Sequence, residues 1–441
     1  MKKSGILAFM LASILLLAGC SGNNAANPGS PAGESGRSAE PGGGDSGSDG
    51  PVTLTWWTMD TPSFVEANKK WIEAYKKAKP NVTINYQYFP YDIFIQKLKA
   101  AYASNTPPDV AQMFGTWVTD YAKNGHLLAL EDDSVKNDIY DAPLGGYTYE
   151  GKLYGIPHEY NIENNGALAH KKMFDDSGIA YPPKTWAELM DAAGKLTVRD
   201  GNKIAVRGFD FTSTDAINFL FLAMILQQGG NYWTEDNDVD FNTPEAEKAF
   251  AAMSDMILAG KISDMTLFGT DEEPYMTFFK GNSAMTMAGP WVIAEGTGTF
   301  GVNDFDYMPI PPFAGDAPVF AAESGWGEVV SKASGHPREA LDFIRFTADP
   351  EQAKMWNLAT FTVPANKAVA ADPDFTGRVA LMKASLDSLE YGKWIGPVGD
   401  RDFWFKTVSD NFYAVVSGKL AAQDALRTIT DSVNEMLARH K

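Results

Sequence analysis

The sequence predicts an α/β protein folded into two lobes. The segment from Pro51 to Lys441 holds about 390 residues, which is more than one hydrophobic core usually serves. Strand and helix patterns alternate along its first part, as they do in α/β folds. An apolar share of 44% and an aromatic share of 12% are typical of a well-packed globular protein. We therefore expect two packed lobes within one chain.

The N-terminus has the pattern of an export signal. Lys2 and Lys3 precede an apolar run of residues 5–18, and small residues lead from that run to Cys20. The run is too short to span a bilayer comfortably as a permanent helix. The pattern resembles a lipoprotein signal, so we predict that residues 1–19 are a signal peptide cleaved before Cys20, which is then lipidated. The alternative is an unlipidated export signal in which the cysteine is incidental.

Residues 20–50 form a predicted tether. The stretch after Cys20 consists almost entirely of Gly, Ser, Pro, Asn and Ala, with no aromatic or large aliphatic side chain. Such a composition cannot bury a core. We expect a flexible segment that holds the folded part of the chain off a membrane surface.

Strand and helix patterns then alternate. Residues 52–57 alternate β-branched and bulky side chains, and residues 82–89 and 110–114 are the next predicted strands. Apolar residues at helical spacing predict a helix that ends at Pro80 and another over residues 93–102. The order strand, helix, strand, helix, strand predicts a lobe with a largely parallel sheet.

Helices dominate the rest of the chain. Thr185 and Glu188 form a capping box that opens a helix after two prolines. Helical patterning predicts further helices over residues 214–228, 244–259, 337–347 and 421–440.

Charge and cysteine content argue against several classes of partner. A formal net charge of −19 argues against nucleic acid. Cys20 is the only cysteine in the sequence, so neither a disulfide nor a cysteine-built metal site can form within the chain. Acidic residues at positions 236, 238, 240 and 247 have the spacing of a calcium loop, but Phe241 stands where that loop needs glycine. We expect no metal and no cofactor.

Two loops carry the chemistry that binds sugars. In open α/β sheets, ligands bind beyond the carboxyl ends of the strands. The first predicted strand leads into Trp57 and Asp60, and the third leads into Thr116 and Trp117. Sugars pack their C–H faces on aromatic rings, while their hydroxyl groups pair with carboxylates and amides. Neighbours in a strand point to opposite faces, so one of Trp56 and Trp57 is expected near the ligand.

Five segments resemble a known family in their order and approximate spacing. They are Pro108-Asp109-Val110 leading to Gly125-His126-Leu127-Leu128, Gly151 to Pro157, Pro183 to Leu189, Phe279 to Trp291, and Ala340 to Gln352. The family is the extracellular solute-binding proteins of group 1, which includes the maltose-binding and multiple-sugar-binding proteins. The resemblance covers essentially the whole chain after Gly50. One departure is Ala169-His170-Lys171, where many members have Tyr-Asn-Lys.

The resemblance implies two α/β lobes joined by hinge crossings that close on a ligand. It implies a first crossing near Glu159 to Glu163 and a second near Glu323 to Gly327. The expected limits are residues 51–160 and 325–358 for lobe 1, and residues 161–324 and 359–441 for lobe 2.

The resemblance also implies ligand-binding residues, at the positions of this chain that match the family's motifs. The aromatic platform corresponds to Trp291, and the polar contact after the first strand corresponds to Asp60. The loop after the third strand corresponds to Thr116 and Trp117. A late helical tryptophan corresponds to Trp404.

Residues at the two crossings add to the expected site. Tyr160 at the first crossing and Trp326 at the second are expected to face the cleft. Glu163 and Glu323 either bind ligand hydroxyls or brace the hinges. The aromatic candidates can alternatively be core residues, which is the role that helical position predicts for Trp186.

The sequence therefore predicts the binding subunit of a bacterial ABC importer, which captures a sugar or oligosaccharide and delivers it to separate permease and ATPase chains. We expect a monomer, lipid-anchored on the extracellular face of the cell membrane. A glycosidase is the alternative, because aromatic rings and paired carboxylates in a cleft also describe that class of enzyme. The sequence has no nucleophile elbow to support an enzyme. A purely adhesive surface protein is a third alternative, and it leaves the closing cleft unexplained.

Overall fold

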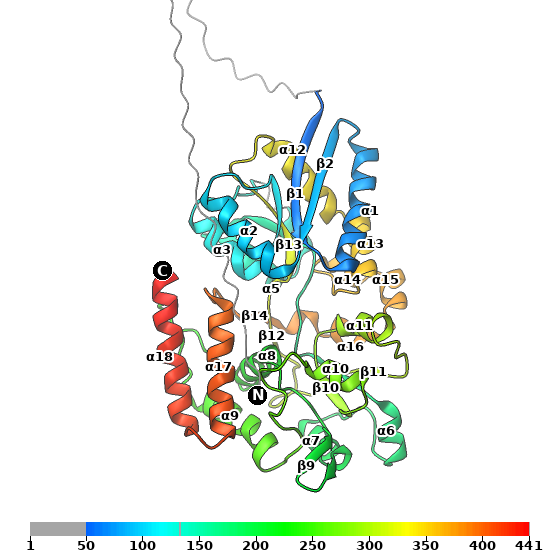
Figure 1. The fold of residues 1–441 in the computed structure, drawn as a ribbon, viewed down its shortest axis with the longest axis vertical. Helices are drawn as coiled ribbons and strands as arrows, with labels where there is room; N and C mark the ends of the chain where they lie inside the picture. Colours follow the sequence, from blue (N-terminus) through cyan, green and yellow to red (C-terminus); the bar gives the residue numbers. More distant parts are fainter. Residues whose placement is uncertain (1–49, 132–133, 441) are drawn as a thin grey trace, which may run out of the picture. The chain divides into compact units, whose positions relative to one another are not determined.

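The first strands and helices match the predicted ones to within a few residues (Figure 1). The computed structural model describes residues 50–131 and 134–440. The predicted signal peptide, Cys20 and all of the tether except Gly50 lie outside the described residues. The first elements are β1 (Val52–Met59), α1 (Pro62–Ala78), β2 (Val82–Phe89), α2 (Tyr91–Ala103) and β3 (Val110–Phe114).

Two later strands complete the sheet that these elements begin. β1 pairs in parallel with β2 and β3, whereas β13 (Trp326–Val330) pairs antiparallel with β3 and with β6 (Gly155–Pro157). The order across the sheet is β2-β1-β3-β13-β6. The expected parallel arrangement therefore holds for the first three strands, while the sheet as a whole is mixed. The reason is that β13 enters the sheet from the other lobe and not through a crossover helix that follows β3.

We call this sheet and the helices packed on it lobe 1. Its core includes Trp56, Trp71, Phe343 and Trp356, which are at most 1% exposed. The rings of Trp71 and Trp356 stack 5.5 Å apart. The further helices of lobe 1 are α3 (Gly115–Lys123), α4 (Val135–Asp138), α5 (Asp141–Tyr147), α12 (Pro337–Ala348) and α13 (Pro350–Thr360).

We call the second packed region lobe 2. Its three-stranded sheet has the order β10-β7-β11, from β7 (Gly166–Ala169), β10 (Met285–Met287) and β11 (Asp306–Pro309). Its core is largely helical and is built around α8, which is buried along most of its length. The main helices are α6 (Lys171–Asp176), α7 (Trp186–Leu196), α8 (Thr214–Gln227), α9 (Pro244–Leu258), α10 (Pro274–Phe279), α11 (Val292–Gly298), α17 (Arg401–Val416) and α18 (Ala422–His440).

Side-chain caps explain where several predicted helices begin. Thr185 accepts a hydrogen bond from the backbone N–H of Glu188, so the predicted side-chain cap opens α7. The return hydrogen bond differs from a capping box, because the Glu188 carboxylate accepts from the backbone N–H of Lys184 and not from that of Thr185. Ser213 and Thr243 cap α8 and α9 as Thr185 caps α7. The predicted helices after residue 200 correspond to α8, α9, α12 and α18.

Short elements connect these parts. They are β4 (Thr148–Tyr149), β5 (Lys152–Leu153), β8 (Val198–Asp200), β9 (Lys203–Val206), β12 (Phe320–Ala322), β14 (Gly392–Trp394), α14 (Lys367–Ala370), α15 (Pro373–Arg378), α16 (Lys383–Leu386), and the 3₁₀ turns Ala380–Met382 and Leu389–Tyr391. β12 and β14 pair in parallel, and α8 packs against β12.

Within the described residues, three segments are paired with one another where the lobes meet. Asn161 and Glu323 face each other in an antiparallel bridge, and Glu159 pairs in the same way with Pro364. These bridges bring the first crossing next to the second and next to the segment that follows α13. The residue limits of the lobes expected from the sequence stay a prediction.

Candidate functional site

A cleft with about 300 Å³ of free space lies between the lobes, beside the crossings. Aromatic rings line it together with carboxylates, hydroxyls and an amide, which is the mixture found in small-molecule sites. Lobe 1 supplies Thr61, Ser63, Phe64, Tyr91, Phe114, Trp117 and Trp326; the crossings and the end of α13 supply Glu159, Asn161, Glu163, Thr360 and Thr362; lobe 2 supplies Asp215, Trp291, Ala294, Glu295 and Arg401.

Lobe 1 gives the cleft an aromatic wall. β3 ends at Phe114 and α3 begins at once, so Trp117 lies in the first turn of that helix. Trp326 begins β13 and is the strand partner of Phe114. The Trp326 ring is perpendicular to that of Trp117 at a centroid distance of 5.4 Å, and it lies 5.1 Å from the Phe114 ring. Such edge-to-face pairs stabilise one another, so a ligand meets a preformed apolar surface.

On the lobe 2 side, Glu163 fixes the ring of Trp291. The Trp291 Nε1–H donates to Glu163 Oε1 at 2.9 Å, and the backbone N–H of Gly289 donates to Glu163 Oε2 at 3.0 Å. A side chain at Gly289 has no room, because a Cβ there would lie 2.5 Å from the carbonyl oxygen of Ile162. The glycine and the carboxylate therefore determine where the Trp291 ring lies.

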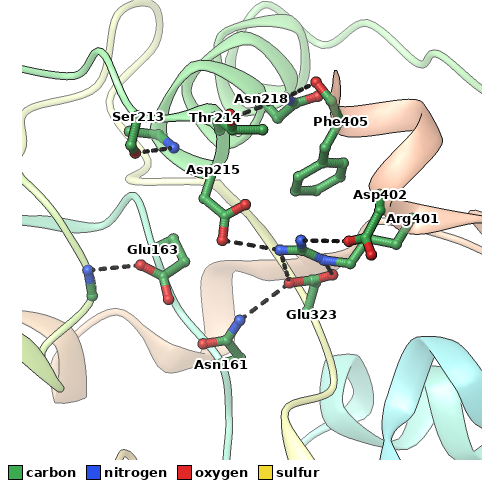
Figure 2. Close-up of polar contacts among 12 residues, drawn as sticks. Asn161, Glu163, Ser213, Thr214, Asp215, Asn218, Glu323, Arg401, Asp402 and Phe405 are labelled. Atoms are coloured by element: carbon green, nitrogen blue, oxygen red, sulfur yellow. Dashed lines mark hydrogen bonds and ion pairs between the residues drawn. The ribbon is translucent and has the colours of Figure 1, made fainter. Parts of the chain in front are cut away.

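Arg401 joins lobe 2 to the second crossing. Asp400 caps α17, which makes Arg401 the first residue of that helix. The Arg401 Nε–H donates to Glu323 Oε1 at 2.5 Å, and Nη2 donates to Glu323 Oε2 at 2.9 Å and to Asp215 Oδ2 at 3.1 Å. Figure 2 shows the guanidinium group between these two carboxylates. Its carbon lies 4.1 Å from the centre of the Phe405 ring.

Glu323 is fully buried, and polar groups surround its carboxylate. Besides Arg401, the Asn161 Nδ2–H donates to Glu323 Oε2 at 3.2 Å. A buried carboxylate without such partners would be very unfavourable. The two crossings and α17 are thus connected through one charged group.

Burial raises the pKa of the cleft carboxylates. The pKa of Glu163 rises to about 8, first through burial and then through the like charges of Asp215 and Glu323. The pKa of Glu159 rises to about 7, chiefly through burial. Burial raises the pKa of Glu323 as well, although Arg401 opposes the rise. Burial alone would lower the pKa of Arg401, but Asp215 and Glu323 raise it well above its usual value.

Several sequence-predicted ligand residues lie at this cleft. Trp117, Glu163, Trp291 and Trp326 line it. Glu323 lies behind the lining and is hydrogen-bonded to Arg401, which does line the cleft. Contact of these residues with a ligand stays a prediction.

The expected cleft positions of Tyr160 and Trp404 are corrected by the structure. Tyr160 is buried and donates its hydroxyl to the Leu389 carbonyl at 3.2 Å. Neighbours in an extended segment alternate in direction, so the residues on either side of Tyr160 line the cleft and its own ring does not. Trp404 is fully buried in the lobe 2 core, 5.5 Å from the ring of Trp233, because α17 presents Arg401 to the cleft and this later position to the core.

Trp57 is also outside the cleft lining. Trp56 points into the core and donates its Nε1–H to Glu328 at 2.8 Å, so Trp57 lies on the opposite face of β1 as the alternation requires. On that face the Trp57 ring packs on Phe89 of the neighbouring strand β2 at 5.5 Å, and Lys97 of α2 lies 5.6 Å from the centre of the ring. Neither tryptophan therefore lines the cleft.

Asp60 and Thr116, which the sequence also predicts to bind the ligand, lie outside the cleft lining. Asp60 is exposed and is not part of the lining, whereas Thr61 and Ser63, which follow it, are. Thr116 is buried and faces a separate cavity. Its neighbour Trp117 takes the cleft position, since consecutive helix residues point in different directions.

Sequence reasoning missed several lining residues, among them Tyr91, Asp215 and Arg401. All three lie in the first turn of a helix, namely α2, α8 and α17. Polar or aromatic residues directly after a helix start are a signal that could have been used, because helix N-termini often border ligand sites. The sequence does not show which helix N-termini lie next to one another in the fold.

Among residues 50–131 and 134–440, no helix has the length and apolarity to cross a bilayer. No cluster of His, Cys, Asp or Glu in this part of the chain is arranged to hold a metal ion.

Three relatives illustrate what the chain is similar to. An uncharacterized ABC transporter extracellular-binding protein of Pyrococcus horikoshii is 25% identical over 67% of this chain and 68% of its own length. The diacetylchitobiose binding protein DasA of Streptomyces coelicolor is 24% identical over the full length of both chains. The crystal structure of a cyclic α-maltosyl-1,6-maltose binding protein from Arthrobacter globiformis superposes with a TM-score of 0.74, at 23% identity, over 88% of this chain and all of that one.

The superposition covers 88% of this chain and all of the Arthrobacter protein, so the similarity in fold includes both lobes. A family model described as bacterial extracellular solute-binding protein matches residues 61–354, which is more than half of the chain and includes both crossings. The chain belongs to the family of bacterial extracellular solute-binding proteins.

Proposed function

We propose that this protein captures a sugar or short oligosaccharide in the cleft and delivers it, chemically unchanged, to the permease of an ABC importer. One observation carries the proposal: tryptophans of both lobes, Trp326 and Trp117 on one side and Trp291 on the other, line one cleft with carboxylates and an amide. Rings stack on the C–H faces of sugars, and carboxylates pair with their hydroxyls. The Streptomyces and Arthrobacter relatives are both saccharide-binding proteins, which supports this ligand class.

We also propose that the protein acts as a monomer that is attached to the extracellular face of the membrane through a lipid on Cys20. The support is the N-terminal pattern of Lys2, Lys3 and the apolar run that ends before Cys20. Capture outside the cell and delivery to a membrane permease both suit a tethered binding protein.

Glycoside hydrolysis is the competing function. Glu159 and Glu163 have raised pKa values, which suit proton transfer near neutral pH. In this cleft, however, Glu163 accepts two N–H groups that fix Trp291, and the family consists of binding proteins. We therefore assign these carboxylates to binding.

The test is a thermal-shift screen of the purified protein against neutral, acidic and amino sugars, followed by calorimetric titration of the hits. A true ligand raises the melting temperature in proportion to the logarithm of its concentration. Chromatography after long incubation should recover the ligand intact. Release of shorter saccharides would show an enzyme, and the absence of any stabilising sugar would contradict the proposal.

A further inference from the structure

A second cavity, which we call the side pocket, adjoins the cleft on the lobe 2 side. It has about 240 Å³ of free space and shares Glu163, Asp215 and Trp291 with the cleft. Its other walls are the first turn of α8 and the start of α10, which contributes Tyr275, together with Glu273 just before that helix. A ligand in the cleft can therefore extend a group past Trp291 into the side pocket.

Three carboxylates from three separate segments line the side pocket. Glu163 lies at the end of the first crossing, Asp215 lies on α8, and Glu273 precedes α10. Among the described residues, no Lys, Arg or His side chain lines this pocket. Asp215 also offsets the partial positive charge at the start of α8. The pocket is therefore acidic, and its described lining supplies no basic side chain.

Arg401 of the cleft offsets only part of this negative charge. Its guanidinium is hydrogen-bonded to Asp215 and Glu323 and lies 3.9 Å from Asp402, so three carboxylates divide one positive charge. The hydrogen-bond partners of Glu163 are neutral N–H groups, of Gly289 and Trp291. Burial and the charge of Asp215 raise the pKa values of both Glu163 and Glu273. An added cation would relieve this repulsion.

Two aromatic rings complete the pocket. The rings of Tyr275 and Trp291 lie 5.2 Å apart and are inclined at 75°. At this angle the edge of one ring meets the face of the other, so no group fits between them, but the ring surfaces that border the pocket remain open to a ligand. Aromatic faces attract ammonium groups. The acidic groups are not arranged to hold a metal ion, whereas an ammonium group does not require closely spaced ligands.

We propose that the side pocket binds an ammonium group of the ligand, so that the captured solute is an amino sugar or an oligosaccharide that contains one. This inference rests on the proposed function and names the ligand class of the same site. The aromatic wall of lobe 1 packs against the sugar ring, and Glu163, Asp215 and Glu273 surround its amine.

A proton should leave the protein on binding. At about pH 7, Glu163, with a pKa of about 8, is mostly protonated in the empty cleft. Burial and the charges of Asp215 and Glu323 disfavour its ionisation, whereas the hydrogen bonds from Trp291 and Gly289 favour it. Arg401 is hydrogen-bonded to Asp215 and Glu323 and not to Glu163. A bound ammonium group favours the ionised form, so the proton is released to the buffer.

The experiment is calorimetric titration with matched sugars: glucosamine against glucose, and the glucosamine disaccharide against cellobiose. We expect the amino sugar of a pair to bind about tenfold tighter or more, which corresponds to roughly 1.4 kcal/mol. The preference should shrink at high salt, because an ion pair is screened. Titrations in buffers of different ionisation enthalpy should reveal the released proton.

Glu273→Gln and Glu272→Gln form a matched pair of variants. Glu273 lines the side pocket, whereas Glu272 pairs with Lys280 and does not line it. Glu273→Gln should lose most of the preference for the amino sugar while keeping its affinity for the neutral one, and Glu272→Gln should keep both. Equal or tighter binding of the neutral sugar to the wild type overturns the inference and leaves sugar capture standing. If no sugar of the panel binds, both proposals fail.

Discussion

The guanidinium of Arg401 holds the carboxylate of Glu323 through two hydrogen bonds, Nε to Oε1 at 2.5 Å and Nη2 to Oε2 at 2.9 Å. The pair joins the first residue of α17 to the second crossing between the lobes. Glu323 is completely buried, so its charge depends on this partner. The cleft and the connection between the lobes therefore share one ion pair.

Arg401→Met should destabilise the protein by about 3–5 kcal/mol, because it leaves the charge of Glu323 buried without its partner. Adding Glu323→Gln to that variant should restore part of the loss, since the buried charge is then removed. Urea unfolding of the two single variants and the double variant measures this coupling. Losses that simply add would show that the two side chains do not depend on one another.

Arg427→Met is the matched control for that series. Arg427 on α18 pairs with Asp424 at 3.2 Å, and both side chains are more than half exposed. Its loss should cost at most about 1 kcal/mol, as exposed pairs do.

Trp291→Ala should weaken ligand binding by roughly thirtyfold to a thousandfold, which corresponds to about 2–4 kcal/mol for a buried aromatic anchor. Trp291→Phe keeps a ring but loses the N–H that donates to Glu163, so an intermediate loss is expected. Calorimetric titration measures both, with circular dichroism to check folding. A folded Trp291→Ala variant that binds within about threefold of wild type would place the stacking surface elsewhere.

Trp186→Ala is the control for the aromatic substitution. Trp186 begins α7 and packs edge to face on Phe313 at 5.6 Å, and it is absent from the cleft lining. The variant should melt at a lower temperature and, once folded, bind the ligand nearly as wild type does.

The ligand-free protein should lose stability as the pH rises from about 5 to about 9. Glu159 and Glu163 have pKa values of about 7 and about 8, above those of an unfolded chain. Their contribution is therefore fully present below the unfolded pKa and is lost as the pH rises through the folded values. Melting curves across this range test the sign. Glu163→Gln should flatten the dependence, and an unchanged slope would contradict the assignment.

Trp404→Ala should destabilise the protein by about 3–5 kcal/mol, because it empties a fully buried site in the lobe 2 core. The variant is expected to keep its ligand affinity at a temperature where it is folded. Urea unfolding and titration separate the two effects. Loss of affinity without loss of stability would show that Trp404 contacts the ligand in the cleft.

Cys20→Ser should release the protein from membranes without changing its ligand affinity. The substitution removes the thiol that we propose is acylated. Cell fractionation and mass spectrometry of the mature N-terminus measure the outcome. An intact Met1 on the mature protein would exclude cleavage before Cys20.

Local patterns predicted the elements of this fold well. Residues 82–89 and 110–114 are strands as expected, and the Thr185 cap starts α7 at the predicted place. These features depend on side-chain alternation and on hydrogen bonds between near neighbours, both of which are visible in sequence. The antiparallel entry of β13 depends on a pairing with β3 across more than 200 residues, and no local pattern encodes that.

The site was harder to predict than the fold. Trp291 follows a glycine and a proline in a motif shared with the family, and it does line the cleft. The prediction for Tyr160 rests on its place at the first crossing and that for Trp404 on the family's late helical tryptophan, but the direction of one side chain decides between cleft and core. The sequence does not single out Arg401 as a ligand-binding residue, because its partners, Asp215 and Glu323, lie far from it in the sequence.

The position of β13 also constrains the order in which the protein can fold while it is being synthesised. β13 lies between β3 and β6, yet residues 326–330 leave the ribosome long after both of those strands. Until then β3 keeps an open edge, which is a template for pairing with other chains. The Trp56 Nε1–H likewise lacks its hydrogen-bond acceptor until Glu328 has been synthesised. A fragment that ends at residue 160 should therefore aggregate, and lobe 1 becomes complete only after most of lobe 2 has been synthesised.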